Sequence, residues 1–445
     1  MDEEVLARAV IGQLRAAGHQ AYLVGGSVRD VLLGVVPKDF DVSTDARPDR
    51  ILDLFPNSGR VGAHFGVVLV RDDSSQVEVA TFRSDHDYAD GRRPAAVHFE
   101  SDPRQDVLRR DFTINGLMLD PETGRVLDFV GGRADLEGRV VRTIGDPEAR
   151  FGEDHLRLLR AIRFAARLHF DIDPATFAAI QRHHALIRTV SAERVRDELV
   201  RILTEGGARR GFELLDASGM LAVILPEVAA MKGVEQPPEY HPEGDVLIHT
   251  LLLLEQFERP TATLALGALL HDVGKPPAFR VAERIRFDGH VEEGVRLARG
   301  ILSRLRFSRD VTEQVEALVA NHMRFKDLHR MKASTLKRFL RLPDFQEHLE
   351  LHRLDCLASN RQLENYDLAK RKLAEFSEEH LKPAPLVTGA DLIAAGYEPG
   401  PAFGEVLRIV EDAQLDGLVR SREEALEMAV TELKRNLHAR RSLGE

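Results

Sequence analysis

The sequence has almost no cysteine. Cys356 is the only one among 445 residues, which excludes an internal disulfide framework and a zinc knuckle built from cysteines. No run approaches the ~20 apolar residues that are needed to span a bilayer. The acidic start, MDEEVLARAV, has neither the basic region nor the apolar core of a signal peptide. These absences predict a cytoplasmic protein with no membrane partner.

Positive net charge is also lacking. The chain carries a formal charge of −11, whereas proteins that bind nucleic acid usually present a basic face. Binding depends on local patches rather than on the sum, and the stretch from 101 to 210 is rich in arginine. Composition therefore leaves nucleic-acid binding open, and it gives no indication of the oligomeric state.

Internal repeats and low-complexity tracts are absent, so the domains must be separated by pattern. Residues 20–130 alternate short β-type runs with helix-type segments, and from about 136 onward the apolar spacing is helical. Pro-rich breaks at 235–245 and 382–389 divide the helical part. We predict an α+β protein with a mixed α/β head (1–135), an all-helical neck (136–234), a third helical domain (235–381) and a helical tail (382–445).

A strand–turn–helix unit near the N-terminus contains a candidate phosphate site. In AYLVGGSVRDVLLG, Gly25 and Gly26 permit close backbone approach to a ligand, and Ser27 suits the N-cap of the following helix. The N-terminus of a helix attracts phosphate, and Arg29 adds positive charge. Taken alone, the two glycines are equally consistent with a structural turn.

Two carboxylates follow in the segment KDFDVS. Asp39 and Asp41 would project from the same face of a strand, because side chains alternate along it. A cation relieves their repulsion, and Mg²⁺ prefers oxygen ligands while keeping positions for triphosphate oxygens. Two such ions can activate a 3′-hydroxyl and stabilise the departing pyrophosphate. Glu78, in QVEVATFR, is either a third carboxylate or a surface residue of an edge strand.

An ordered series of motifs resembles the polymerase-beta-like nucleotidyltransferase superfamily. The series is GGSVRD (25–30), DFDV (39–42), LRRDFTIN (108–115), EDHLRLLRAIRFAA (153–166) and ERVRDEL (193–199). The resemblance is to the class II branch, which holds bacterial tRNA nucleotidyltransferases and poly(A) polymerases. It implies template-independent addition of CCA to tRNA from CTP and ATP. The alternatives are addition of the terminal A only, a poly(A) polymerase, and a phosphohydrolase whose head binds nucleotide as a regulator.

The segment GEDHLRLLRAIRF contains a candidate base reader. On one helix, Asp154 and Arg157 would share a face at a spacing of three residues. A carboxylate only accepts hydrogen bonds and a guanidinium only donates them, so the pair fits the amino group and ring nitrogen of cytosine and adenine. Uracil and guanine present the reverse order. Alone, such a pair is usually a surface ion pair; the resemblance implies the base-reading role, with Glu153 holding the arginine.

Further residues of the head and neck are expected to complete the nucleotide site. Asp111 and Asn115, one helical turn apart, would bind the ribose hydroxyls, and Arg110 would contact the triphosphate. Arg160 and Arg163 either contact phosphate or form ion pairs within the neck.

The polar, turn-rich stretch from 84 to 106 predicts a mobile loop. In the family that the chain resembles, the corresponding loop is needed for the switch from C to A addition. Its segment DYADGRRP (87–94) is intact, which favours an enzyme that adds CCA or the terminal A.

A second set of metal-ligating residue types lies in the third domain. Imidazole and carboxylate together suit a divalent metal, and the doublet in ALLHDVGKP is flanked by further histidines and an aspartate. Their order resembles the HD phosphohydrolase superfamily. The resemblance implies a core of His249, His271, Asp272 and Asp355, with His290 and His322 as candidates for a second metal. The identity of the metal stays open.

The same resemblance extends to other parts of the second half. Lys275, in the same motif, would contact phosphate. In some bacterial CCA-adding enzymes an HD domain trims 2′,3′-cyclic phosphates or 2′-phosphates, which implies the same possible activity here. The tail, from 387 onward, resembles the segment of such enzymes that grips the elbow and T-arm of tRNA.

Overall fold

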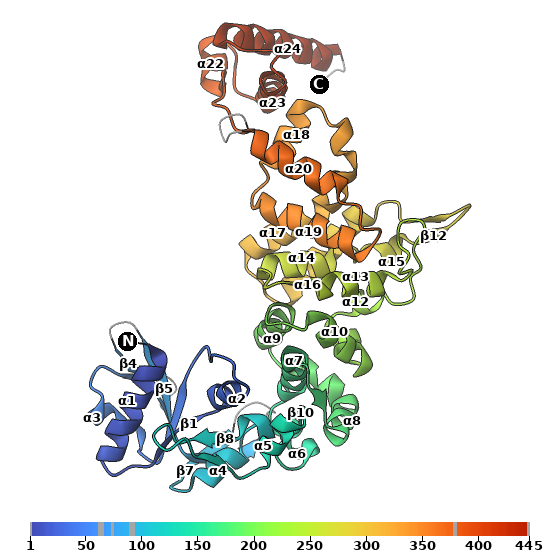
Figure 1. The fold of residues 1–445 in the computed structure, drawn as a ribbon. Helices are drawn as coiled ribbons and strands as arrows, with labels where there is room; N and C mark the ends of the chain where they lie inside the picture. Colours follow the sequence, from blue (N-terminus) through green and yellow to red (C-terminus); the bar gives the residue numbers. More distant parts are fainter. Residues whose placement is uncertain (1, 61–65, 73–74, 89–93, 377–380, 443–445) are drawn as a thin grey trace. The chain divides into compact units, whose positions relative to one another are not determined.

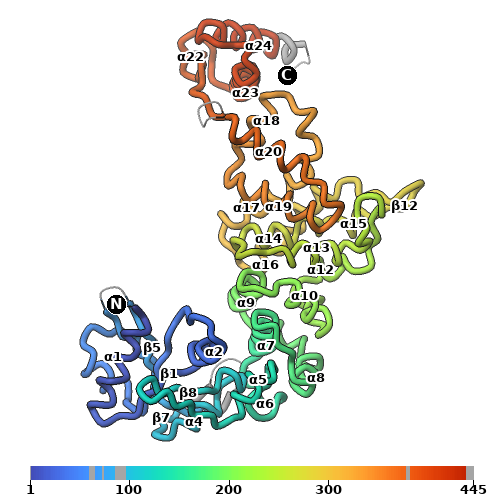
Figure 2. The backbone as a smooth tube through the Cα atoms, viewed as in Figure 1, coloured from blue at the N-terminus to red at the C-terminus, as the bar shows by residue number. Residues whose placement is uncertain are grey.

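The computed structural model describes residues 2–60, 66–72, 75–88, 94–376 and 381–442, whose backbone is traced in Figures 1 and 2. The chain divides into two compact units. The first unit is Met1–Lys232, Phe257–Ala265 and Ile301–Phe307; the second is Gly233–Gln256, Leu266–Gly300 and Ser308–Glu445. The division into four domains stays a prediction.

A mixed sheet forms the head of the first unit, with the strand order β3-β4-β5-β2-β1-β8-β9. The strands are β1 (Ala21–Val24), β2 (Asp41–Thr44), β3 (Gly59–Arg60), β4 (Val67–Arg71), β5 (Gln76–Thr81), β8 (Leu117–Leu119) and β9 (Val126–Asp128). β2 pairs parallel with β5 and antiparallel with β1. Helices α1 (Glu3–Ala16) and α3 (Pro48–Leu54) pack against the sheet, and α1 buries Leu6, Val10 and Leu14 at helical spacing.

The stretch predicted as a mobile loop is largely ordered structure. β6 (Arg83–Tyr88) and β7 (Pro94–Phe99) form an antiparallel hairpin, and α4 (Pro103–Leu108) follows. The prediction was wrong because paired backbone groups stabilise the hairpin despite its polar composition. Residues 89–93, the centre of DYADGRRP, lie outside the described residues.

The remaining elements of the first unit are mostly helical. They are α2 (Gly26–Leu32), η2 (Thr113–Asn115), α5 (Gly132–Glu137), α6 (Pro147–Glu153), α7 (Arg157–Leu168), α8 (Pro174–His183), η3 (His184–Thr189), α9 (Ala192–Thr204), α10 (Ala208–Ala217), α11 (Met220–Ile224) and α12 (Pro226–Ala229). The predicted all-helical neck also contains one short parallel pair, β10 (Val140–Val141) with β11 (Asp171–Ile172). The predicted α+β fold is confirmed.

Where the structure describes it, the second unit is helical apart from an isolated bridge between Glu235 and Asp245 and a hairpin of two short strands, β12 (Arg280–Val281) and β13 (Ile285–Arg286). Its helices are α13 (Val246–Glu255), α15 (Lys275–Ala278), α17 (Arg309–Asn321), η4 (His322–Arg330), α18 (Ala333–Leu340), α19 (Phe345–Ala358), α20 (Glu364–Glu375), α22 (Gly389–Ala394), α23 (Pro401–Leu415) and α24 (Arg422–Ser442). Helices α14 (Ala262–Leu270) and α16 (His290–Arg304) contribute residues to both units. Within the ranges given above, no helix has both the length and the apolar character to cross a membrane.

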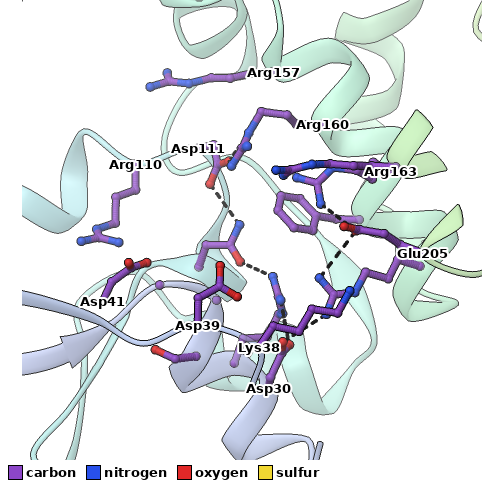
Figure 3. Close-up of a pocket in the computed structure, with 18 of the residues that line it drawn as sticks. Asp30, Lys38, Asp39, Asp41, Arg110, Asp111, Arg157, Arg160, Arg163 and Glu205 are labelled. Atoms are coloured by element: carbon purple, nitrogen blue, oxygen red, sulfur yellow. Dashed lines mark hydrogen bonds and ion pairs between the residues drawn. The ribbon is translucent and has the colours of Figure 1, made fainter. Parts of the chain in front are cut away.

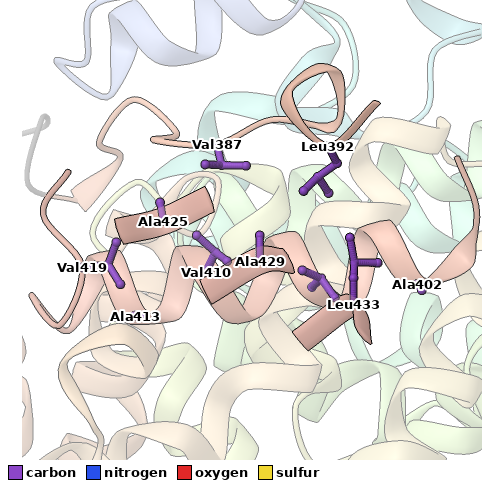
Figure 4. Close-up of a cluster of buried hydrophobic side chains, with 10 residues drawn as sticks. Val387, Leu392, Ala402, Val410, Ala413, Val419, Ala425, Ala429 and Leu433 are labelled. Atoms are coloured by element: carbon purple, nitrogen blue, oxygen red, sulfur yellow. The ribbon is translucent and has the colours of Figure 1, made fainter. Parts of the chain in front are cut away.

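The tail has a small apolar core of its own (Figure 4). Leu392 of α22 packs against α23 and α24 in a cluster whose other buried members are mostly alanine and valine. Small side chains contribute little apolar area each, so the one fully buried leucine of α22 carries much of the contact between this short helix and its neighbours.

We expect Leu392→Ala to loosen the tail. Truncation of a fully buried leucine costs about 2–5 kcal/mol, so the amides of α24 should exchange faster by hydrogen–deuterium exchange while those of the first unit do not change. Ile393→Ala is the matched control, because the neighbouring side chain is 52% exposed. Equal effects of the two changes would contradict this assignment of the tail core.

Candidate active sites

A polar cavity of about 610 Å³ in the first unit gathers the residues predicted to bind nucleotide. Every one of them except Glu153 lines it: Gly25, Gly26, Ser27, Arg29, Asp39, Asp41, Arg110, Asp111, Asn115, Asp154, Arg157, Arg160 and Arg163. Figure 3 shows Asp39 and Asp41 on one side and Arg157, Arg160 and Arg163 of α7 on the other. Carboxylates and guanidinium groups therefore face one another across the cavity.

The Gly-Gly turn brings the backbone close to charged side chains. Gly25 has φ +72°, and a Cβ at this position would lie 3.3 Å from Nη1 of Arg110 and 3.7 Å from Oδ2 of Asp41. Both the conformation and the lack of space favour glycine. Gly25, not Ser27, is the N-cap of α2, so that prediction was wrong; the Ser27 hydroxyl donates to the Val24 carbonyl at 2.9 Å.

The two aspartates flank the start of β2. The strand begins at Asp41, and Asp39 precedes it, so the prediction that both lie on the strand was wrong. Glu78 stands directly beside Asp41 in the parallel register, on a strand interior to the sheet, which rules out the edge-strand interpretation. Burial raises the pKa of Asp41 to about 6, and the charges of Glu78 and Asp39 act in the same direction against Arg110. This is a set of like charges that a cation would neutralise.

Asp154 and Arg157 do not share a helix, contrary to the prediction. Asp154 is the extended residue that ends α6, and α7 begins at Arg157. The aspartate breaks the helix because its Oδ1 accepts the Leu156 amide at 3.1 Å, a local bond that competes with helical pairing. Its Oδ2 accepts from Arg194 at 2.8 Å.

Arg157 is held by three acceptors. Its guanidinium donates to Oε2 of Glu153 at 2.5 Å, to the Arg109 carbonyl at 3.0 Å and to the Arg150 carbonyl at 3.2 Å. Glu153 thus contacts the arginine as the resemblance implied, from outside the cavity wall. A guanidinium has five N–H donors, so donors remain for a ligand.

A chain of hydrogen bonds, from Asp30 to Arg160, links residues that line the cavity. Arg29, only 2% exposed, donates to Asp30 at 2.8 Å and to Oδ1 of Asn115 at 2.8 Å, and the Asn115 amide donates to Asp111 at 3.1 Å. Asp111 also binds Arg160 through Nε at 2.9 Å and Nη2 at 2.6 Å. Asp111 precedes a 3₁₀ turn, η2, so the predicted helical spacing of Asp111 and Asn115 was wrong although the two side chains touch.

Arg160 and Arg163 form the ion pairs that were one of the two interpretations, and they line the cavity as well. Arg163 donates to Oε2 of Glu198 at 2.6 Å and lies 3.5 Å from Glu205. Burial acts to raise the pKa of Asp111, but the charge and hydrogen bonds of Arg160 lower it to about 2.

The second unit gathers all the residues of the H…HD…H…H…D pattern. Nε2 of His249 lies 3.0 Å from Asp355, Nε2 of His271 lies 3.2 Å from Asp272, and Nε2 of His322 lies 3.7 Å from Asp272. Two groups drawn from this pattern have ligand atoms within 4.8 Å of one another, namely His249–His271–Asp355 and Asp272–His290–His322, so Asp272 groups with the two histidines expected for a second metal. A third group, His241–Glu243–His249, shares His249.

The four histidines of this cluster share one orientation. Their Nδ1 atoms bond to Glu243 (His249) or to a backbone carbonyl (His271, His290 and His322) at 2.7–2.8 Å. Their buried Nε2 atoms are not hydrogen-bonded within the described residues, and those of His249, His271 and His322 instead face the carboxylates of Asp355 or Asp272 at 3.0–3.7 Å. A histidine that donates from Nδ1 keeps the Nε2 lone pair for a metal, so the donor set fits divalent ions.

Comparison with known proteins covers both sites. The family described as Poly A polymerase head domain matches residues 21–142, the family described as Probable RNA and SrmB- binding site of polymerase A matches 169–232, and the HD domain family matches 245–349. A CCA-adding enzyme of Levilactobacillus brevis is 32% identical over 433 residues, which cover 97% of this chain and 98% of that enzyme. The chain belongs to the family of CCA-adding enzymes.

Other CCA-adding enzymes extend the similarity to the fold. One from Streptococcus thermophilus is 30% identical over 429 residues, or 96% of each chain. The crystal structure of the Bacillus stearothermophilus CCA-adding enzyme in complex with CTP has a TM-score of 0.73 and 26% identity, and the match covers 99% of this chain and 100% of that one. A nucleotidyltransferase head and an HD domain together imply the use of divalent metal.

The sequence did not reveal several residues that lie at the two sites of this CCA-adding enzyme. Lys38, Arg167, Arg201 and Glu205 line the first cavity. Arg167 extends the spacing of Arg157, Arg160 and Arg163 along α7 and could have been found by it. Lys275 was expected to contact phosphate, but its Nζ is 2.6 Å from both Asp272 and Gln236, inside the metal-ligand cluster.

Glu243 is the other residue that the sequence did not reveal. Its Oε1 accepts from Nδ1 of His249 at 2.7 Å and from Nδ1 of His241 at 2.9 Å. Burial acts to raise the pKa of Glu243, but these two hydrogen bonds lower it to about 2. A charged Glu243 fixes the proton of His249 on Nδ1 and so turns Nε2 toward Asp355 and Asp272.

We call His249, His271, Asp272, His290, His322 and Asp355 the HD cluster. We expect Glu243→Gln to weaken metal binding at this cluster about 10- to 100-fold, the usual effect of removing a partner that orients a ligand histidine. Calorimetric titration with Mn²⁺ in an Asp41→Asn background, which keeps the head out of the measurement, gives the affinity. Glu239→Gln is the matched control, because Glu239 is exposed four residues earlier. An unchanged affinity in Glu243→Gln would contradict the orienting role.

Proposed function

We propose that the chain rebuilds the 3′ end of tRNA by adding C, C and A from CTP and ATP without a nucleic-acid template. The observation that carries this proposal is the cavity of the first unit. The glycine turn, the two aspartates and a set of arginines line this cavity together, and neighbouring residues hold Asp154 and Arg157 by hydrogen bonds. Membership of the CCA-adding enzymes and the likeness to a structure bound to CTP support it.

We assign a divalent ion, Mg²⁺, to Asp39 and Asp41, with Glu78 beside them. The burial and the like charges that together raise the pKa of Asp41 are the observation in favour of this assignment. Bound Mg²⁺ supplies charge for the triphosphate and the attacking 3′-hydroxyl. The protein's own contribution is the cationic wall: Arg110, against the glycine turn, and Lys38 would orient the triphosphate.

We assign the choice of base to Asp154 and Arg157. Each oxygen of Asp154 accepts one bond from the protein, which leaves lone pairs for the amino group of cytosine or adenine. The free N–H groups of Arg157 would donate to the ring nitrogen. Because Arg194 and Glu153 hold the two side chains, neither turns to suit uracil or guanine.

The second unit supports a further activity at the HD cluster. The unbonded Nε2 atoms of its histidines favour a divalent metal, whose Lewis acidity would serve hydrolysis of a phosphate ester. We propose that this site removes 2′,3′-cyclic phosphates or 2′-phosphates from RNA 3′ ends. Such trimming would leave the free hydroxyls that nucleotide addition needs.

We expect Asp41→Asn to lower kcat for addition at least about 10³-fold, because the lost metal charge is worth several kcal/mol. The test supplies tRNA lacking CCA, or ending in CC, with each nucleotide singly and resolves the products by length. Asp53→Asn, an exposed aspartate of α3, is the control.

The products separate the candidate functions. Two C and one A support CCA addition; A only on tRNA ending in CC supports the narrower activity; long A tracts support a poly(A) polymerase. Release of phosphate from 2′,3′-cyclic ends should be unchanged in Asp41→Asn. Loss of both activities would mean that the two sites are not separable.

Asp154→Ala should relax the choice of base. Loss of one well-formed contact is worth about 1–3 kcal/mol, roughly 5- to 150-fold in kcat/KM of CTP over UTP. Arg194→Gln should have a smaller effect, since it leaves the acceptor in place, and Asp197→Ala, at an exposed position, should have none. Unchanged selectivity in Asp154→Ala would remove its base-reading role.

A further inference from the structure

The outer edge of η4 in the second unit is basic. In a 3₁₀ helix, side chains three residues apart lie in line. One such line, His322, Phe325 and Leu328, is buried and places His322 in the metal-ligand cluster. The other lines face solvent in the second half of the element, whereas Met323 and Arg324 of the first turn are half-buried.

Cations occupy those outer lines. Lys326 and His329 follow one another at a spacing of three, Lys332 continues the series just beyond the helix, and Arg330 lies beside it; all are exposed. We call these residues the basic edge. From 324 to 332 the only acid is Asp327, although the whole chain carries a charge of −11.

Ion pairing within the described residues does not account for the cations of the basic edge. Across the described ranges, Lys326, Arg330 and Lys332 take part in no ion pair. The basic residues that follow on α18 are different: Arg338 and Arg341 both bind Glu411 at 2.6 Å. Stability of the unit thus explains the second group of cations but not the first.

We propose that the basic edge binds the phosphodiester backbone of RNA beside the HD cluster of the same unit. This inference rests on the proposed function, which supplies the RNA. Lys326 and His329 lie about 6 Å apart along the 3₁₀ axis, and Arg330 and Lys332 follow at its C-terminal end, so this edge presents charge to successive phosphates. η4 begins at the metal-ligand candidate His322, so a strand that follows η4 from the basic edge toward its N-terminus leads toward that cluster.

The test is the salt dependence of tRNA binding by the full chain. The triple variant Lys326→Gln, Arg330→Gln, Lys332→Gln should reduce the slope of log K against log salt by about 2–3, close to the loss of three phosphate contacts. Its affinity should fall at least about tenfold at low salt. The three side chains are exposed and unpaired, so the thermal midpoint should not move.

The matched control removes the same charge from the same unit. Arg280→Gln, Arg284→Gln and Arg286→Gln neutralise the exposed arginines of the β12–β13 hairpin, which are interspersed with Glu283 and Asp288. An unchanged slope in the basic-edge variant, or an equal change in the control, would overturn the proposal. So would weakened binding of poly-glutamate with unweakened binding of tRNA, which would point to an acidic protein partner.

A second measurement locates the contact. Hydrogen–deuterium exchange of the peptide 322–332 should slow when tRNA binds to the unaltered chain and not when it binds to the triple variant. If the triple variant extends and binds tRNA with a normal salt slope, this inference fails and the proposed function stands. If the unaltered chain neither binds nor extends tRNA, the proposed function itself fails.

Discussion

A buried guanidinium needs a carboxylate, and the nucleotide cavity is organised by this constraint. Leaving a buried charge unpaired costs several kcal/mol. Arg163 is held by Glu198, Arg160 by Asp111 and Arg29 by Asp30. Arg160 and Arg163 join α7 to the segment before η2 and to α9. Arg29 and Asp30 are neighbours within α2, which Asp30 links to α7 through Arg167 at 3.2 Å. The arginines of α7 that line the cavity are therefore held in place by these carboxylates.

The same pairing accounts for a cavity rich in arginine within an acidic chain. The chain has a net charge of −11, and some of its carboxylates form ion pairs with the arginines that line the cavity. Asp41 is the exception, since burial and the nearby charges of Glu78 and Asp39 raise its pKa despite Arg110. The HD cluster is organised differently. Glu243 or a backbone carbonyl accepts a hydrogen bond from Nδ1 of each histidine, and the Nε2 atoms lie close to one another and to the carboxylates. One site orients charge through ion pairs, and the other through the choice of histidine tautomer.

Much of the local chemistry could be predicted from the sequence because motif spacing is short. The strand–turn–helix around Gly25 needed only neighbouring residues, whereas the start of β2 at Asp41, after Asp39, was not predicted. Errors arose where a local polar bond competed with regular structure. Asp154 takes the Leu156 amide and ends a helix that apolar spacing alone would continue, and the polar stretch after Arg83 pairs with itself as a hairpin. Periodicity does not report either event, because it records only which side chains are apolar.

The sequence by itself determined the order of the elements, the α+β class and the residue types of both sites. It did so because turns, helix faces and motif spacings depend on residues that are near in the chain. Only the tertiary structure decided which partner each charge meets. Glu243 is close to His249 in the sequence, but no motif or periodicity indicates their contact. Asp111 binds Arg160, which lies 49 residues further along the chain. Long-range pairing depends on how the chain closes its loops and packs, and a linear pattern does not contain that information.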